Sequence, residues 1–502
     1  MRHLNIFILA TLLLAISLVG FSQSTTNVKI SEQQDIAVFA SYYTYDIPAN
    51  IVNRLDDGIM NLFLTMRRFK VNGYQFRFSE GNLETFISRV KQLKEGKITT
   101  SEKFVDPKWG TITLTPDMLE KLLNSFTIVI PNIKTFGVES KWDAGDTYYI
   151  VTMGVSLKFF DPDTGEIFAV IDARTTYSGK SSELIEMITG IKGRNLTKEE
   201  TIEKAIDSLL EEIKYKIRGI EKFKLYTTIN DKVGGKYYVE LGKNYDIYPG
   251  LELELIKTRT VKIGGKDRSV KEIGGLVRVV NAEEDFSEVI PIFGEPNIGD
   301  QLTDALRRGY IFKLFFGLQN IIYEDPRDTF LLSYFQSKWN NLQDGIAPMI
   351  GISGINDDLS AFFEPQADVY LVISSPITLG VGLRGNYAFY LRNIKVKPYV
   401  GLDLIGAFTY LGSIWWWWYY YDFYLTTFSI AFNGGLSLEI LFSKSFGLSF
   451  DAGYRYSIPI YDYIRVYDSW GNSYESSFFS SSLIPLFALR GINGKVEIFL
   501  RF

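Results

Sequence analysis

The residue types that carry most enzyme chemistry are nearly absent from this sequence of 502 residues. It contains no cysteine, and its single histidine is His3. Residues 1–22 have the pattern of a secretory signal peptide, because Arg2 and His3 precede an apolar run over 6–19 and a small-x-small site at 20–22. Without this segment the mature chain has neither thiol nor imidazole. That excludes zinc sites built on those ligands, cysteine nucleophiles and Ser-His-Asp triads.

Carboxylates remain, but they fall in predicted loops. Asp143 and Asp146 lie close together, as do Glu283, Glu284 and Asp285, and neither group implies a pocket. Paired carboxylates cleave glycosides only when they face each other at a suitable separation, which sequence spacing alone does not show. We therefore predict no catalytic residue and no enzyme activity.

Glycine-containing motifs indicate turns. Asp-Pro-Asp-Thr-Gly at 161–165 has its glycine one position early for an EF-hand, and no glutamate follows at the required distance. Gly-Gly-Lys at 234–236 and at 264–266 lacks the spacing of a phosphate-binding loop and the helix that should follow it. We predict hairpin turns at all three places, with no metal and no cofactor.

Composition changes near residue 308. Residues 23–307 have 80 charged side chains in 285 positions, whereas residues 308–502 have 30 in 195. Aromatic residues change in the opposite direction, from 32 in residues 1–307 to 44 in residues 308–502. A water-soluble domain with so few charges could not easily cover its surface, so the two parts are predicted to face different solvents. The formal charge of −5, which becomes −6 without Arg2, gives no indication of a nucleic-acid partner.

The last 195 residues alternate between apolar residues and small or polar ones. Over 428–442, phenylalanine, isoleucine and leucine occupy one face of the predicted strand, and mostly serine, alanine, asparagine and glycine occupy the other. A soluble sandwich would carry lysine or glutamate on its outer face. A small and polar face suits the crowded interior of a narrow barrel whose apolar face meets lipid. We predict an antiparallel transmembrane β-barrel over 308–502.

Eight strands are predicted, an even number that brings both ends of the barrel sheet to one side of the membrane. They are expected near 308–319, 346–355, 363–374, 377–391, 396–411, 424–442, 446–458 and 482–502. Short connections near 356–362, 392–395 and 443–445 would be periplasmic, and longer ones at 320–345, 412–423 and 459–481 would face outward. The alternation slips after Leu489, so Gly491–Gly494 is either a bulge or an additional turn, which would give ten strands.

Charged residues on the small and polar faces are candidates for the barrel interior. An eight-stranded barrel is just wide enough to be filled by its own side chains. The predicted lumenal charge network consists of Arg384, Asp403, Glu439, Asp451, Arg455, Glu497 and Arg501. Because a filled barrel does not conduct, a diffusion porin is not the favoured interpretation.

Seven consecutive large aromatic residues form the most unusual string in the chain. They are Trp415, Trp416, Trp417, Trp418, Tyr419, Tyr420 and Tyr421. Amphipathic rings of this kind suit a membrane-interface girdle at headgroup depth, which is our prediction. The alternative is a platform that stacks carbohydrate or binds a cationic ligand.

Residues 23–307 show helix and strand signals first and strand signals afterwards. Strands are expected over 36–45, 125–139, 147–160 and 166–178, and helices over 48–69 and 83–93, the second followed by a charged loop. A capping box at 197–200 and an apolar stripe from Ile202 to Ile220 predict a closing helix that packs into the core. Residues 23–221 are therefore predicted to form an α/β domain, and residues 222–307 a small β module.

The end of the chain resembles the closing strand of bacterial outer-membrane β-barrels. Lys495-Val-Glu-Ile-Phe-Leu-Arg-Phe502 alternates in polarity and finishes on an aromatic residue. Residues 398–403 and 441–448 also resemble a strand start and a tight turn of small barrels of that kind. The resemblance implies a location in the bacterial outer membrane, with outer-membrane lipid around the barrel, and implies that Phe502 is recognised by the barrel-assembly machinery.

Two further resemblances concern the N-terminal part. The element order and the hairpin Phe159-Phe-Asp-Pro-Asp-Thr-Gly-Glu-Ile-Phe168 resemble the periplasmic domain of the curli-secretion family and its TolB-N-terminal-like relatives. Strand and turn segments over 239–300 resemble the C-terminal module of the flagellar assembly protein T family, which is paired there with a TolB-like domain. The chain lacks the lipidated cysteine of the curli-secretion family and has its own barrel. Both departures count against that family's multi-subunit export pore.

Together these features predict a multidomain, non-enzymatic outer-membrane protein. Its barrel would anchor a periplasmic protein-interaction region in cell-envelope or surface-appendage assembly, with an unidentified periplasmic protein as the partner and no nucleic acid. The alternatives are an export or secretion channel, and a surface receptor or adhesin that uses the outer barrel loops.

Overall fold

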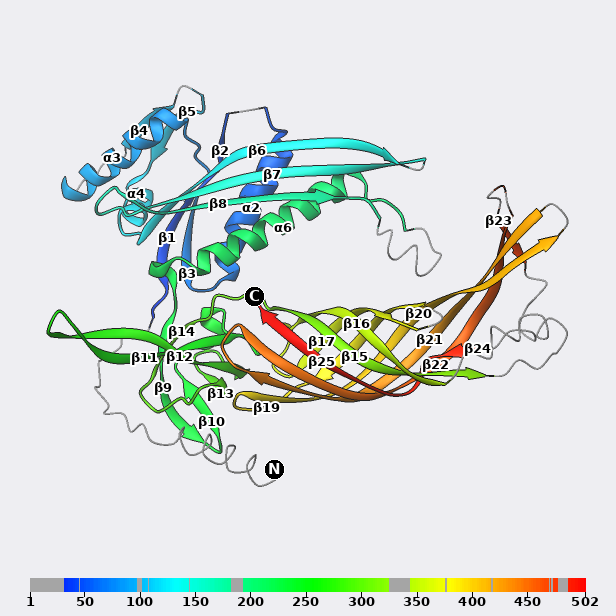
Figure 1. Ribbon diagram of the computed structural model, residues 1–502. Coiled ribbons are helices and arrows are strands. Elements are labelled where there is room, and N and C mark those ends of the chain that lie inside the picture. Colours follow the sequence, from blue (N-terminus) through cyan, green and yellow to red (C-terminus); the bar gives the residue numbers. More distant parts are fainter. Residues whose placement is uncertain are drawn as a thin grey trace.

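The structure is a computed structural model with three folded bodies (Figure 1). An α/β body comes first in the chain, a closed six-stranded barrel follows, and a closed eight-stranded barrel comes last. The six-stranded barrel lies against one end of the eight-stranded one (Figure 1). The described residues are 31–44, 46–96, 102–106, 108–143, 145–181, 193–324, 344–374, 377–416, 419–468, 470, 473–476 and 486–502. The predicted signal peptide lies outside them.

The α/β body is built on a mixed sheet with strand order β3-β1-β6-β7-β8. β1 runs parallel to β3 and β6, whereas β7 and β8 continue the sheet antiparallel, and the short β2 pairs with β6. The strands are β1 (Gln34–Phe39), β2 (Tyr42–Tyr43), β3 (Phe69–Tyr74), β6 (Thr127–Asp143), β7 (Asp146–Phe160) and β8 (Ile167–Ser178). The turn at 161–165 joins β7 to β8, and Gly165 adopts a φ of 71° that suits glycine.

Helices cover both faces of this sheet. Leu55 and Phe63 of α2 and Leu209 of α6 pack on one face, and Phe86 of α3 and Leu119 of α4 pack on the other. The helices are α2 (Ala49–Thr65), α3 (Glu80–Gly96), α4 (Pro116–Leu123) and α6 (Lys198–Arg218). The predicted capping box of α6 is present. The charged segment after α3 was predicted as a loop; it contains the hairpin of β4 (Glu102–Asp106) and β5 (Gly110–Leu114), and then α4.

Residues 226–304 close into a six-stranded barrel with strand order β10-β13-β12-β11-β14-β9. Its interior is apolar, with Leu255, Val277, Val289 and Leu302 fully buried. The elements are β9 (Tyr226–Val233), β10 (Lys236–Val239), β11 (Glu252–Ile263), β12 (Lys266–Ala282), β13 (Ser287–Phe293) and β14 (Gln301–Asp304), with short 3₁₀ turns η1 (Glu221–Phe223) and η2 (Lys243–Tyr245). Both Gly-Gly pairs adopt positive φ angles in tight hairpins, as their sequence predicted.

Eight antiparallel strands form the larger barrel, which closes because β15 pairs with both β16 and β25. This confirms the predicted eight-stranded barrel. The strands are β15 (Tyr310–Glu324), β16 (Gly345–Asn356), β17 (Phe363–Val372), β18 (Ile377–Tyr387), β20 (Ile394–Trp416), β21 (Tyr419–Leu441), β22 (Phe446–Asp468) and β25 (Arg490–Arg501), with short β19 (Phe389–Leu391), β23 (Ser473–Ser476) and β24 (Leu486–Ala488) added to them.

The slip in alternation near the end of the chain is a bulge. Ala488 lies opposite Ile322 and Asn493 lies opposite Gln319. Four residues of one strand therefore face two of the other, and Gly491 takes a φ of 116° within this stretch. The bulge keeps the last segment in the sheet, so no additional strand pair is formed there.

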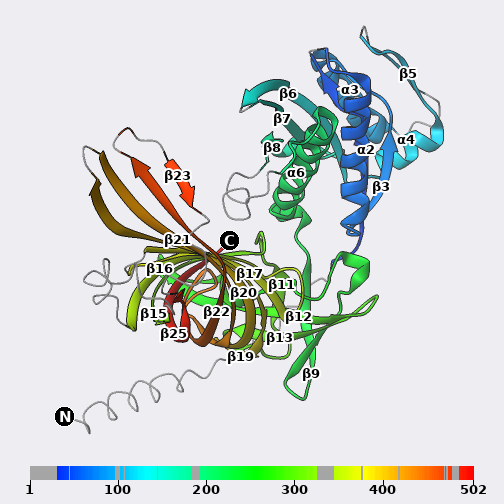
Figure 2. The same ribbon diagram turned by 90° about the vertical axis from the view of Figure 1, so that its right-hand side faces the viewer.

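The outward ends of three strands differ from the prediction. β20 and β21 stay paired as far as Trp416 and Tyr419, and β21 pairs with β22 as far as Asp468. Much of the predicted loops 412–423 and 459–481 is therefore strand, and it continues beyond Phe408, where the pairing of β20 with β18 ends. Both views show this extension past the barrel (Figures 1 and 2). Aromatic and β-branched residues favour strand over loop. That propensity accounts for the difference.

Candidate functional site

The outer wall of the eight-stranded barrel is apolar. Val496, Ile498 and Leu500 of β25 are exposed, whereas Glu497 and Phe499 between them are buried. The same alternation holds along β15, and most exposed large apolar side chains of the described residues belong to this barrel. A continuous apolar wall of this extent is typical of a surface that meets hydrocarbon.

The interior of the barrel is charged. All seven predicted lumen residues are buried: Arg384, Asp403, Glu439, Asp451, Arg455, Glu497 and Arg501. Seven further charged residues are buried with them: Lys313, Asp357, Glu364, Asp368, Lys395, Lys397 and Lys495. The fourteen comprise seven basic and seven acidic side chains, so the buried charge of the described barrel residues balances. Balance is required because an unpaired buried charge is very costly.

Asp403 is the centre of the outward part of this network. Its carboxylate accepts hydrogen bonds from Tyr370 Oη at 3.0 Å and Asn433 Nδ2 at 2.6 Å, and it pairs with Arg455 at 2.8 Å. Arg455 also donates to the side-chain oxygen of Gln319 at 2.6 Å. These residues come from five strands, so the network crosses the whole lumen.

The middle of the lumen holds a second group of charges. Arg384 pairs with Asp368 and, at 3.1 Å, with Asp451. Lys495 lies 3.5 Å from Asp451 and 2.5 Å from Glu497. The group links β18 with β17, β22 and β25, so each predicted lumen charge in this layer has a partner of opposite sign.

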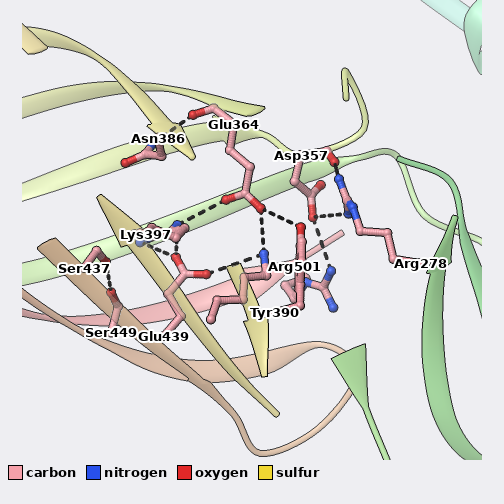
Figure 3. A network of polar contacts seen from close by, with 12 residues as sticks. Arg278, Asp357, Glu364, Asn386, Tyr390, Lys397, Ser437, Glu439, Ser449 and Arg501 are labelled. Atoms are coloured by element: carbon pink, nitrogen blue, oxygen red, sulfur yellow. Dashed lines mark hydrogen bonds and ion pairs between the residues drawn. The ribbon is translucent and has the colours of Figure 1, made fainter. Parts of the chain in front are cut away.

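A third layer consists of lysines between two glutamates (Figure 3). Glu364 accepts from Lys395 at 2.8 Å and from Lys397 at 3.2 Å. Glu439 pairs with Lys313 at 2.7 Å and also with Lys397. The ammonium group of Lys397 therefore pairs with both carboxylates of this layer.

Glycines on the inner face make room for these side chains. A Cβ atom at Gly382 would lie 2.1 Å from the carboxylate of Asp403, and one at Gly380 would lie 2.1 Å from the ring of Tyr370. The glycines of the small and polar strand faces therefore leave the space that Asp403 and Tyr370 occupy. Farther outward, Val372, Ala407 and other apolar side chains form a cluster, which Phe315 joins from the charged layers. The described part of the lumen is thus filled by its own side chains.

The six-stranded barrel covers one end of the eight-stranded barrel, here called the domain end. Arg278 of β12 is fully buried at this contact. Its guanidinium donates to the backbone carbonyls of Asp357, Ser360 and Ala361, which belong to the turn between β16 and β17. It also pairs with Glu252 of β11 at 2.9 Å. One arginine thereby fixes the turn of one barrel to two strands of the other.

Two more arginines complete this cluster, and one of them, Arg501, is seen beside Asp357 and Arg278 in Figure 3. Arg307 pairs with Glu252 at 2.7 Å and with Asp357 at 3.0 Å, and Arg501 pairs with the same carboxylates at 2.5 and 3.2 Å. Burial alone would raise the pKa of Glu252, but the guanidinium groups of Arg307, Arg501 and Arg278 hold it well below its usual range. Burial is likewise outweighed at Asp357, whose pKa these arginines lower. Both carboxylates are therefore ionised at neutral pH.

A further buried junction connects the six-stranded barrel to the α/β body. Asp304 of β14 accepts from Arg68 at 2.7 Å and from the backbone N–H of Leu225 at 3.2 Å. Arg218, at the end of α6, lies 3.9 Å from the same carboxylate. Burial by itself would raise the pKa of Asp304, but Arg68 and Arg218 lower it.

Sequence reasoning missed half of the charged lumen and all of the arginine cluster except Arg501. Lys495 is two residues from Glu497, so continuing the alternation would have found it, and the same holds for Lys395 and Lys397. Arg278 stands alone in an apolar strand, and a buried arginine needs partners. The sequence thus contained a signal for the residue, but none for its partners, which lie 26 to 83 positions away.

The predicted girdle residues lie at the tip of the β20–β21 hairpin. Trp415 and Trp416 end β20, and Tyr419, Tyr420 and Tyr421 begin β21, whereas Trp417 and Trp418 fall outside the described residues. The tip is seven or more residues beyond the last β18 pair, or about 20 Å along the strand at the usual rise. The girdle assignment stays a prediction.

Exposed aromatic rings do gather elsewhere, at the domain end of the wall. They are Tyr310, Phe363, Tyr387, Phe389, Phe442, Phe446 and Phe502. They flank the short connections or the end of β25, except Tyr310, which begins β15. This ring of aromatic side chains has the position expected of one interfacial girdle, and it includes Phe502, which was predicted as an assembly signal.

The described residues contain no cluster of three or more carboxylate or imidazole side chains that could hold a metal ion. In the same part of the chain, no helix is both long enough and apolar enough to cross a membrane.

Comparisons with known proteins find similarity for the barrel. No protein-family model and no curated protein matches the chain. Among solved structures, neisserial surface protein A is 14% identical over 39% of this chain and 97% of its own, with a TM-score of 0.23. A major outer membrane protein from Thermus thermophilus is 11% identical over 38% of this chain and 99% of its own, with a TM-score of 0.25. The N-terminal barrel domain of Pseudomonas aeruginosa OprF is 12% identical over 38% of this chain and 98% of its own, with a TM-score of 0.21. We draw no functional conclusion from likenesses at this level.

Proposed function

We propose that the chain is a non-enzymatic outer-membrane protein whose filled barrel anchors a periplasmic protein-interaction region. The observation that carries the proposal is the lumen, where fourteen buried charges fill the barrel and Arg278 fastens the second barrel over one end. Such a barrel can hold other bodies at a membrane but offers no open path for solutes. The role that fits is assembly of the cell envelope or of a surface appendage.

The connections support the orientation. At the domain end they are short, at 357–362, 392–393 and 442–445, whereas β20, β21 and β22 extend at the other end. Outer-membrane barrels have short periplasmic turns and longer outer connections. Our proposal therefore assigns both other bodies to the periplasmic side.

Single-channel recording in planar bilayers tests the anchor function. We expect purified full-length protein to give no steady openings, because the lumen is packed from the domain end to the apolar cluster beyond Asp403. Steady openings of large conductance from the wild-type protein would overturn the proposal and favour an export channel.

The β6–β7 hairpin is the surface best suited to a protein partner. It extends past the covering helices (Figure 1), and Trp142 near its tip is 74% exposed. A photo-crosslinking residue at Trp142 in intact cells is expected to capture a periplasmic protein. The same residue at Lys262, on the exposed hairpin of the six-stranded barrel, is the matched control. Equal capture at both positions would reject the hairpin as the partner site.

A receptor or adhesin is the second candidate, favoured by the extension of β20 and β21 beyond the barrel. Aromatic residues at such a tip could stack on carbohydrate. A chain with 411–424 replaced by a two-residue turn tests this function. Unchanged binding of cells to a glycan array would remove it, whereas loss of binding to specific glycans would support it.

A further inference from the structure

A cavity of about 530 Å³ lies at the domain end, where all three bodies meet. Tyr215 of α6 forms one side of it, and Arg307 and Arg308, from the segment between the barrels, form another. Lys444 and Arg501 of the eight-stranded barrel complete the basic lining. Among the lining side chains, Glu254 is the acidic one and four are basic, of which Arg307 and Arg501 are already paired with Glu252 and Asp357.

Two of these basic groups are exposed enough to meet a ligand, although each has a carboxylate partner. Arg308 and Lys444 are about half exposed, and their partners are Glu212 at 2.7 Å and Glu254 at 2.8 Å. Exposed ion pairs of this kind contribute little, so an anion can join or replace a carboxylate at low cost. Arg308 also stacks over the ring of Tyr215 at 4.6 Å, which holds its guanidinium at the cavity.

A second cavity, of about 590 Å³, is a groove on the outer wall of the same barrel. Small outward-facing residues, Gly354, Pro365 and Ala367, lie between the larger Phe312 and Leu383. A Cβ atom added at Gly354 would meet no other atom within 4 Å. The groove is therefore open, and its surface is almost entirely apolar.

The two cavities adjoin each other at Tyr310 and Phe502, which line both of them. Tyr310 is 57% exposed and belongs to the aromatic ring at the domain end of the wall. A tyrosine at headgroup depth marks the boundary between hydrocarbon and the polar layer. The basic cavity therefore lies on the water side of this boundary, and the apolar groove lies on the hydrocarbon side.

We propose that these two adjoining cavities together bind one glycerophospholipid of the periplasmic leaflet. Its phosphate lies in the basic cavity, near Arg308 and Lys444, and one acyl chain occupies the groove over Gly354. The inference rests on the proposed function, because the groove meets acyl chains only if the barrel is in a membrane. Lipid bound there touches α6, the segment between the barrels and the barrel wall, and so ties the periplasmic bodies to the bilayer surface.

Native mass spectrometry of the purified full chain with dioleoyl phosphatidylglycerol tests the proposal. We expect wild-type protein to retain one lipid, and Gly354→Phe, which fills the groove, to retain more than about tenfold less. Each buried methylene contributes roughly a fourfold factor in affinity, so loss of a few contacts is sufficient. Gly434→Phe is the matched control, because Gly434 is on the opposite wall and its added Cβ makes only an ordinary 3.6 Å contact.

A double variant and a competition with inorganic phosphate distinguish a lipid site from a site for free phosphate. Arg308→Ser with Lys444→Ser is expected to weaken retention as well, and inorganic phosphate in excess is expected to leave the lipid bound. Equal retention by Gly354→Phe and Gly434→Phe, or complete displacement by inorganic phosphate, would overturn the lipid site. Migration of unheated samples on SDS gels shows whether each variant barrel is folded, and flotation with phosphatidylcholine vesicles shows membrane insertion. Wild-type protein that does not float contradicts the proposed function, whereas protein that floats but retains no lipid contradicts this inference alone.

Discussion

The two closed barrels of this chain place their apolar and charged side chains on opposite faces: the smaller barrel is apolar inside, and the larger one is apolar outside. In the six-stranded barrel, Leu255, Val277 and Val289 fill the interior, and the hairpin over 266–272 exposes lysine, arginine and aspartate. In the eight-stranded barrel, Lys397 and Glu439 are buried, and Leu436 and Leu438 on the neighbouring positions are exposed. Both use the same alternation of side chains along a strand. The difference is the solvent that each outer surface has to meet.

The two barrels show what a charged interior requires that an apolar interior does not. An apolar interior needs no specific partners, so the small barrel is held by packing. A charged interior is stable only when every charge has a partner. The larger barrel therefore requires fourteen side chains, placed on seven of its strands and one turn, to match one another.

The largest effect is expected from a charge placed inside the small barrel. Val277→Lys buries an ammonium group among apolar side chains, with no partner designed for it, and should cost about 3–5 kcal/mol or more. This is much of the stability of a small domain. Rapid proteolysis within residues 226–304, with the eight-stranded barrel left intact, would show the loss.

Val233→Lys is the control for this variant. Val233 is 58% exposed on the same barrel, and its replacement should change stability by less than about 0.5 kcal/mol. If both variants resisted protease equally, the small barrel would not depend on an apolar interior.

Removing one charge from the large barrel is the next largest change. Lys397→Met removes one of the two lysines that Glu364 and Glu439 share, leaving Lys395, and should cost about 3 kcal/mol. The temperature at which the barrel unfolds, followed by migration on SDS gels, measures this loss. Adding Glu439→Gln restores the balance of charge and is expected to recover part of it. A double variant no more stable than Lys397→Met alone would argue against charge balance as the controlling factor.

A charge introduced on the outer wall of the eight-stranded barrel tests whether that wall faces hydrocarbon. Leu436→Arg places a guanidinium near the middle of the wall and should cost about 2–4 kcal/mol of folding into lipid vesicles. The matched change on the small barrel, Ile298→Arg at a residue 52% exposed, should cost less than about 0.5 kcal/mol. Similar costs at the two positions would show that the wall does not face lipid.

The smallest predicted effect is a dependence on pH at the junction with the α/β body. The pKa of Asp304 is lower in the folded chain than in the unfolded one, so its ion pairs stabilise the junction above the unfolded value, near pH 4. That contribution is lost as the pH falls through the lower folded value. Protease cleavage between 218 and 226, measured from pH 5 to pH 2, should rise in the wild type.

Asp304→Asn is the comparison for that experiment. The variant should be cleaved faster at pH 5 and should show less change on acidification, because the titrating group is gone. Parallel curves for the two proteins would exclude Asp304 as the source of the pH dependence.

Much of the barrel could be predicted from the sequence because alternation along a strand is local. The strand from Phe446 and the last strand to Arg501 begin or end close to their expected positions. The hairpin extension of β20 and β21 was missed because consecutive aromatic residues have no alternation to follow. β3, β4 and β5 were missed for a related reason, since they are short and mixed in polarity.

The candidate site was predicted in part. Buried charges such as Arg384 and Asp451 were visible because they interrupt a small and polar face. Their pairing was not, because Arg384 and Asp451 are 67 positions apart and meet only when the barrel closes. The same limit applies to Arg278, whose carbonyl partners lie about 80 positions away.

The sequence by itself determined the alternation, the absence of cysteine and of any histidine after His3, and the change in composition near residue 308, because these depend only on residue types and their order. Only the tertiary structure decided which charges meet, which end of the large barrel is covered, and where basic and apolar cavities join. Each of these depends on strands that are distant in the chain and adjacent in space. Closing the barrel brings them together, and no local pattern records that.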